Sequence, residues 1–301
     1  MAASRIFLIK HVHSKNKGLI LGSIGVFIFA LTLPAARYAA PYLDPIFIGL
    51  GRACCVAPVA IMLLFINKAP IPTNSQFKQL IIVAFGTVFG FPVLTAIAMQ
   101  TVPAAHGGIV IGILPMATAL AGVLISDERP SIGFWLTSLI GAGLVVTFSL
   151  LDGFDTLSLG HLALLGSVIC AAVGYAYGAR LSKSLAGWQV VSWALVISLP
   201  LAIIPASLYA PSSINDVPSS IWMAFAYMAL MSQYFGFFFW YKGLAMGGIA
   251  RVSQTQLLQP FITIFAALLL LGESLNLSTL IFALAVVASV AISRKMPIYS
   301  K

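Results

Sequence analysis

The amino-acid sequence predicts an all-α integral membrane protein whose ten transmembrane helices form two inverted five-helix repeats. Composition, a succession of apolar segments and one repeated spacing support this fold class. Of the 301 residues, 60% are hydrophobic and 8% are charged, and the mean hydropathy is +1.05. A soluble domain carries about 25% charged residues. This chain cannot cover a water-facing surface, so lipid must be the solvent for most of it.

Ten apolar segments follow one another along the chain, and each approaches the roughly 20 residues that a membrane-spanning helix needs. They cover residues 18–38, 45–66, 78–99, 104–125, 131–150, 160–180, 188–209, 219–241, 250–271 and 276–293. No stretch long enough for a soluble domain remains. The first segment has the basic start of a signal peptide, but Arg37 stands where small cleavage-site residues belong, so we expect a retained span.

The basic residues indicate how these spans are threaded. With a cytoplasmic N-terminus, the inner ends and loops hold every lysine and arginine except Arg37 and Arg52. This bias is typical of multi-pass proteins and places both termini in the cytoplasm, here of a bacterial inner membrane. The net charge of +9 is therefore a consequence of topology. We expect no nucleic-acid partner.

A repeated spacing divides the chain into halves. Pro115 precedes Glu128 by 13 positions, Pro260 precedes Glu273 by 13, and these are the only two glutamates. A shift of 145 residues also aligns further alanines, threonines and leucines of spans 4 and 9. Because five spans separate the two motifs, the second half must cross the membrane in the opposite sense. Inverted repeats are the architecture of many secondary transporters, with the substrate site between the halves.

The repeat predicts four parts of the chain: a basic cytoplasmic tail at 1–17, a first five-helix repeat at 18–150, a second, inverted repeat at 160–293 and a cytoplasmic tail at 294–301.

Several motifs carry a resemblance to a known family. They are "LPMATALAGVLISDERPS" and "LLQPFITIFAALLLLGES", which close spans 4 and 9, Arg52 in "DPIFIGLGRA" and "WYKGLA" at the end of span 8. With these motifs the chain resembles the drug/metabolite transporter superfamily, EamA type, over nearly its whole length. The resemblance implies ten spans in two five-span repeats and export of a small molecule. The tryptophan often found in the family's first span is absent from "GSIGVFIFALTLPAARYA", so its role cannot be carried over.

Span 9 is the most polar span and supplies the first candidate site residues. Ser253, Gln256 and Gln259 are three apart and share one helix face. Their polar groups must face protein or water, because unpaired amides are costly in lipid. Glutamine offers both donors and acceptors, which suits a polar or zwitterionic solute. Contact between helices is the alternative role.

Spans 8 and 6 supply further substrate-binding candidates, which are aromatic or amide side chains: Tyr227, Gln233, Tyr234 and Tyr175. Trp240 and Tyr241 lie near the predicted cytoplasmic end of span 8, and we interpret them as part of an interfacial aromatic belt.

The charged candidates have open roles. His106 lies in the first turn of span 4, where a protonated imidazole and the helix dipole would favour an anion. Arg52 is the only charge well inside a span and is either structural or a partner for a substrate carboxylate. Glu128 and Glu273 lie at span ends, so we interpret them as caps for the loops that follow.

Four prolines lie inside spans 1, 3, 4 and 9, where each removes a backbone hydrogen bond and bends its helix. They are Pro34, Pro92, Pro115 and Pro260. In a membrane, each freed carbonyl needs a partner in protein or in a wet cavity. We expect these bends to line the cavity as hinges, with static kinks as the alternative.

The residues predict transport and no catalysis. We find no catalytic set, no metal-ligand cluster and no cofactor motif, and no span interior holds a carboxylate. The missing carboxylate disfavours the export of cationic drugs. Phosphorylated solutes need cationic residues to hold the phosphate, and only Arg52 lies at depth, so they are disfavoured too. We expect a small neutral or zwitterionic metabolite, most of all amino acids. The alternatives are export of drugs or other metabolites with proton or sodium coupling, and a non-transporting scaffold or sensor. Besides substrate and lipid no partner is expected, and the oligomeric state is open, a monomer included.

Overall fold

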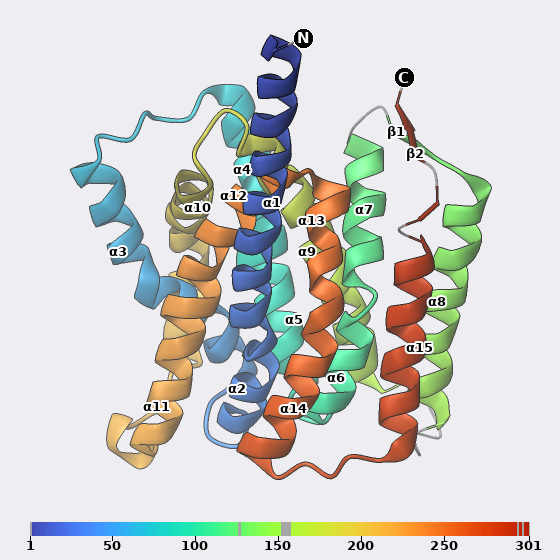
Figure 1. The fold of residues 1–301 in the computed structure, drawn as a ribbon. Coiled ribbons are helices and arrows are strands. Elements are labelled where there is room, and N and C mark those ends of the chain that lie inside the picture. The colour runs from blue at the N-terminus through green and yellow to red at the C-terminus, as the bar shows by residue number, and fades with distance from the viewer. Residues whose placement is uncertain (1, 126–127, 152–157, 294, 297, 301) are drawn as a thin grey trace.

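The protein is a bundle of long helices (Figure 1), seen in a computed structural model that describes residues 2–125, 128–151, 158–293, 295–296 and 298–300. The first half of the chain contains α1 (Ala2–Ala30), α2 (Thr32–Ala39), the π-helix η1 (Phe47–Gly51), α3 (Arg52–Ile66), α4 (Asn74–Ala84), the π-helix η2 (Phe85–Gly90), α5 (Phe91–Ala98), α6 (Ala104–Ile111), α7 (Leu114–Ile125), β1 (Glu128–Pro130) and α8 (Ile132–Leu151).

The second half repeats this plan. It contains α9 (Leu159–Leu181), α10 (Gly187–Leu208), the 3₁₀-helix η3 (Ile214–Asp216), α11 (Ser219–Ala226), the π-helix η4 (Tyr227–Phe235), α12 (Gly236–Gly247), α13 (Ile249–Ser253), the 3₁₀-helix η5 (Gln254–Leu258), α14 (Gln259–Leu271), α15 (Leu277–Ser293) and β2 (Ile298–Ser300).

The predicted fold class is confirmed. Within the described residues, eight continuous helical segments are long and apolar enough to cross a membrane. Two shorter apolar helices, Trp135–Val145 within α8 and Leu277–Ser293, match the fifth and tenth predicted spans. The predicted start of span 3 is four residues late, because the first turn of α4 is polar. A capping box between Thr73 and Gln76 marks the true start and is readable in the sequence.

The ends of the chain meet at one end of the bundle. Figure 1 shows the N- and C-termini at the same, upper end. Span 1 runs away from this end, whereas α9, its counterpart in the second half, runs toward it (Figure 1). Both predicted tails contain regular structure: α1 is helical from Ala2, and β2 pairs antiparallel with β1.

Each candidate hinge proline lies in the first turn of a new helical segment. Pro34 follows a turn at Leu31, Pro92 follows η2, Pro115 follows a break between α6 and α7, and Pro260 follows η5. A proline in the first turn costs little, because its missing N–H would have no partner within the helix there. The four prolines therefore stand where their spans are interrupted, and a hinge function for them remains a prediction.

Side chains from other spans bind the carbonyls near these interruptions. Thr263 donates its hydroxyl to the carbonyl of Ala30 at 2.8 Å, and that carbonyl is four residues before Pro34. Gln233 donates its amide to the carbonyl of Thr87 in η2 at 3.1 Å. A membrane interior offers no water to do this, so the protein must satisfy these carbonyls itself.

Glycines allow spans of the two halves to pack closely in two equivalent pairs, span 1 with span 8 and span 6 with span 3. A Cβ added at Gly18 in span 1 would lie 2.6 Å from the backbone nitrogen of Gly247 in span 8. A Cβ added at Gly86 in span 3 would lie 2.9 Å from the Cα of Gly174 in span 6. Span 1 therefore packs on span 8 as span 6 packs on span 3, which is the exchange that an inverted repeat requires.

These contacts predict the effect of adding a methyl group. We expect Gly18→Ala and Gly86→Ala each to lower the free energy of unfolding by about 1–3 kcal/mol, because backbone faces backbone and neither helix can yield. Gly143→Ala is the matched control, since a Cβ there meets nothing within 4 Å. Thermal unfolding in detergent provides the measurement. Equal midpoints for all three variants would contradict the close packing.

Candidate functional site

The polar stripe of span 9 lies inside the protein. Ser253, Gln256 and Gln259 are all buried, and Gln254 is buried beside them. The intervening segment η5 is a 3₁₀-helix, in which residues three apart lie directly above one another. Neither amide atom of Gln256 has a hydrogen-bond partner among the described residues, and the same holds for the Oε1 of Gln259. These buried amide atoms are unpaired among the described residues, and the binding of a solute by them remains a prediction.

The polar candidates of span 8 make hydrogen bonds within the protein. Tyr227 donates its hydroxyl to the carbonyl of Ile28 at 2.8 Å. The hydroxyl of Tyr234 forms a hydrogen bond with that of Ser192 at 2.8 Å, and Gln233 donates to the carbonyl of Thr87. These contacts join spans 8, 1, 7 and 3. They favour the structural role for these three side chains, and their binding of substrate remains a prediction.

An aromatic cluster lies between spans 1, 6 and 8. The ring of Tyr175 is 5.4 Å from that of Trp240, 5.9 Å from that of Phe237 and 6.3 Å from that of Phe29. The interpretation of Trp240 and Tyr241 as an interfacial belt is wrong, because both are 0% exposed. Span 8 continues to Gly247 and so carries these rings deeper than we expected. The indole Nε1 of Trp240 has no hydrogen-bond partner in the described part of the chain.

The end of the bundle opposite to the termini is closed by Glu273. Its two carboxylate oxygens accept hydrogen bonds from the backbone N–H groups of Ala104 and Ala105, at 2.8 and 2.9 Å. These are orphan donors at the start of α6, where the helix dipole also favours a negative charge. Glu273 is therefore a cap, but for a helix of the other repeat and not for the loop that follows it. The side chain of Glu128 lies outside the described part of the chain.

The helix before this contact is held by the opposite charge. Arg37 donates from Nη1 to the carbonyls of Met99 and Gln100, at 2.7 and 3.0 Å, just past the end of α5. A cation suits the negative end of a helix as an anion suits the positive end. The connection from α5 to α6 is thus fixed at both ends by charged side chains from other segments.

His106 belongs to a buried histidine pair at the same end. Its Nε2 lies 3.1 Å from the Nε2 of His161 in α9, and the Nδ1 of His161 lies 2.7 Å from the hydroxyl of Ser158. The ring of Phe148 packs against that of His106, with 4.4 Å between the ring centroids. One of the two facing nitrogens must donate and the other must accept. A pair with both imidazoles protonated would place two N–H groups head to head and break the contact. The sequence places these histidines 55 positions apart, so their pairing was not foreseen.

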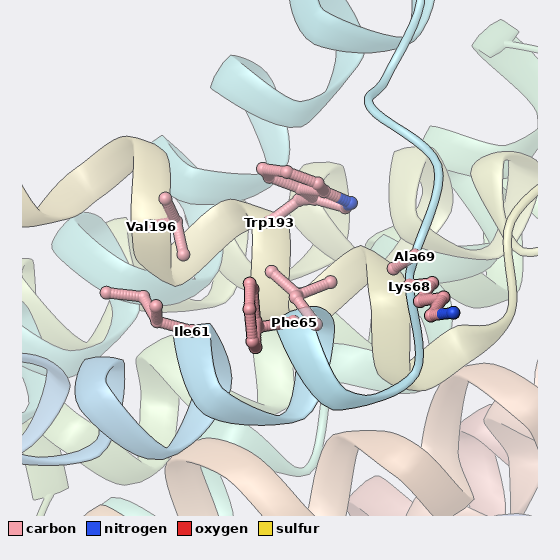
Figure 2. A pocket seen from close by; sticks show the side chains of 7 residues that line it. Ile61, Phe65, Lys68, Ala69, Trp193 and Val196 are labelled. Carbon is pink, nitrogen blue, oxygen red and sulfur yellow. The ribbon is translucent and has the colours of Figure 1, made fainter.

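A surface groove of about 400 Å³ lies elsewhere, between α3 and α10 (Figure 2). Its lining is apolar apart from Lys68, and it consists of Ile61, Leu64, Phe65, Lys68, Ala69, Trp193 and Val196. Phe65 is exposed, which is typical of a surface that faces lipid chains. None of the candidate substrate residues lines this groove, so it is separate from the candidate site.

The Glu273 contact predicts a loss of stability on neutralisation. We expect Glu273→Gln to lower the free energy of unfolding by about 1–2 kcal/mol, because a charged double acceptor becomes a neutral single one. Asp216→Asn, which changes an exposed carboxylate in η3, serves as control and should change little. Thermal unfolding of both variants in detergent tests the prediction, and equal effects would contradict a specific cap.

The histidine pair predicts a dependence on pH. The contact needs one of the two facing nitrogens to carry a hydrogen and the other to lack one, so stability should fall when acid protonates both rings. While at least one ring is neutral, the contact is kept and stability should be flat. We expect His161→Asn to remove the fall and His13→Asn to leave it unchanged. Unfolding midpoints between pH 5 and 8 give the answer; an acid response in His161→Asn equal to that of the native protein would contradict the assignment.

The comparisons with known proteins agree with this architecture. A family model described as "EamA-like transporter family" matches residues 16–150 and again 158–294. The chain is 42% identical to "Uncharacterized transporter YdeK" of Bacillus subtilis (strain 168), over 94% of this chain and 99% of that one. It is 25% identical to "Uncharacterized transporter YyaM" of the same organism, over 83% and 85% of the two chains. A solved structure titled "Crystal structure of protein" shares the fold, with a TM-score of 0.68, 16% identity and coverage of 92% and 97%. The chain belongs to the EamA-like transporter family, within the drug/metabolite transporter superfamily.

Proposed function

We propose that this chain is a secondary transporter that moves a small neutral or zwitterionic metabolite, most of all an amino acid, and performs no chemical step on it. The observation that carries the proposal is the buried, unpartnered amide of Gln256, with Gln259 one turn away in a proline-interrupted span. A buried amide without a partner costs free energy, so a protein that keeps one has a use for it. A polar solute with donors and acceptors would complete these groups.

An asymmetry between the halves supports alternating access. Thr263 and Thr118 correspond under the 145-residue shift, and both are buried. Thr263 donates to a carbonyl of span 1, whereas the hydroxyl of Thr118 has no partner among the described residues. Two equivalent positions thus take different environments in one structure. If the two repeats exchanged these environments, the solute site would open to the other side of the membrane.

The setting follows from the topology. We place the protein in the bacterial inner membrane with both termini in the cytoplasm, because the basic residues gather at the end where the termini lie. The Glu273 contact then closes the outer face. Apart from the solute and lipid, the mechanism needs no partner, and a single chain contains both repeats.

The histidine pair favours proton coupling as a second candidate. Without proton coupling, the solute moves by facilitated diffusion or exchange. This is the first candidate, because no carboxylate that could carry a proton lies within a span interior. His106 and His161 could instead gain a proton as the outer end opens, because opening separates the two facing nitrogens. Solute accumulation in liposomes with and without an imposed pH gradient distinguishes the two: accumulation that depends on the gradient and is lost in His161→Asn supports coupling.

Flux into liposomes tests the proposed function itself. We expect the purified protein to exchange labelled amino acids across the bilayer, and Gln256→Leu to reduce the rate at least tenfold while the protein stays folded, because the solute loses its amide partner. Gln100→Leu, an exposed loop position, is the control and should keep the native rate. No flux of any amino acid by the native protein would contradict the proposed substrate class.

A further inference from the structure

Arg52 stands deep in the membrane-spanning region. It is the first residue of α3, eight positions after Asp44 at the start of span 2. With a helical rise of about 1.5 Å per residue, it lies about 12 Å from that end. The hydrocarbon core of a bilayer is about 30 Å thick, so this depth is close to its middle.

Burial of the side chain and the missing partner of its Nε argue against the two structural roles that an intramembrane arginine ordinarily has. Arg52 is 2% exposed, so its guanidinium does not extend along the span to a polar surface. Its Nε finds no hydrogen-bond partner within the described part of the chain. All seven acidic residues of the sequence lie at span ends or in loops, so no carboxylate within a span offers a counter-charge.

An unpaired charge in this position is expensive. Removing an ion from water costs several kcal/mol even after the protein relaxes, and a counter-ion with good geometry is needed to offset it. Intramembrane arginines consequently mark substrate paths more often than packing. The missing partner of Arg52 would have to be an anion that comes and goes.

The surroundings of Arg52 indicate the shape of that anion. Tyr175 is close enough to interact with it electrostatically. The rings of Phe29, Phe237 and Trp240 pack around Tyr175, with centroids 5.4 to 6.3 Å from it. Aromatic faces bind apolar bodies and tolerate a nearby cation. The guanidinium itself presents a planar fork that matches a carboxylate with two parallel hydrogen bonds.

We propose that Arg52 binds the carboxylate of the transported solute, with the apolar part of the solute against the aromatic cluster of Phe29, Tyr175, Phe237 and Trp240. This rests on the proposed function and narrows it to monocarboxylates with an apolar or aromatic body, amino acids included. A phosphate ester carries more charge than one guanidinium neutralises. An amine without a carboxylate would be repelled.

Binding can be measured without transport. We would record the thermal unfolding midpoint of the purified protein with phenylalanine, with phenylalanine amide and with phenethylamine at equal concentration. The acid should raise the midpoint, whereas the amide and the amine should not. Arg52→Met should abolish the rise, and Arg52→Lys should weaken it, since a lysine keeps the charge without the fork. Arg180→Met removes an exposed arginine near the end of α9 and should behave as the native protein.

The stability of the unliganded variant separates this role from a structural one. If Arg52 awaits a ligand, Arg52→Met should unfold at the native temperature or above it, because an apolar side chain replaces an unpaired buried charge. Marked destabilisation of Arg52→Met, or failure of both variants to fold, would show that Arg52 is structural and overturn the proposal. An equal midpoint rise with phenylalanine and its amide would also overturn it.

Flux measurements keep this inference distinct from the proposed function. Exchange of phenylalanine and its amide at equal rates, unchanged in Arg52→Met, would overturn the role of Arg52 and leave the transporter intact. A carboxylate-specific midpoint rise that requires Arg52, without flux of any solute, would support the Arg52 site and contradict the transport function. We expect phenylalanine flux at least tenfold above that of the amide, and at least a tenfold loss in Arg52→Met.

Discussion

The carboxylate of Glu273 on the first turn of α6 joins the two halves of the molecule at one end. Glu273 lies two residues after the end of span 9, and span 4 begins at Ala104, so two hydrogen bonds of 2.8 and 2.9 Å connect the repeats at this end of the bundle. A helix start buried without a cap would leave orphan N–H groups. The cap fixes the position of α6. It thereby fixes His106, which is two residues after Ala104 and contacts His161. The closure of this end depends on that contact.

The polar groups inside the bundle fall into two sets. The first set repairs the interruptions that prolines require, as Thr263 does for Ala30 and Gln233 for Thr87. The second set has no partner among the described residues and includes Arg52 Nε, Trp240 Nε1 and both amide atoms of Gln256. The first set holds the broken helices in shape, and the proposed function assigns Arg52 and Gln256 of the second set to the solute. The distinction separates residues of the same chemical type, such as Gln233 and Gln256, by what they contact.

Much of the fold could be predicted because lipid imposes simple rules on a sequence. Span 4 was predicted at the bounds that the structure has, and the prolines of spans 4 and 9 begin equivalent segments. The site was less accessible, because hydropathy says nothing of which face a side chain takes. Trp240 was assigned to the interface because it lies near the predicted cytoplasmic end of span 8, although its ring is buried. The partners of Glu273 and His106 lie 169 and 55 positions away in the chain, and no local pattern connects them.

We propose that Glu273 holds the end of the bundle opposite to the termini shut and that its release opens a path to the solute. Pulsed electron resonance between spin labels at Gln100 and Asn276, two exposed positions flanking the contact, tests it most directly. The account predicts a single short distance in the otherwise native protein and an added longer distance in Glu273→Gln. The same distance distribution in both proteins would contradict the claim.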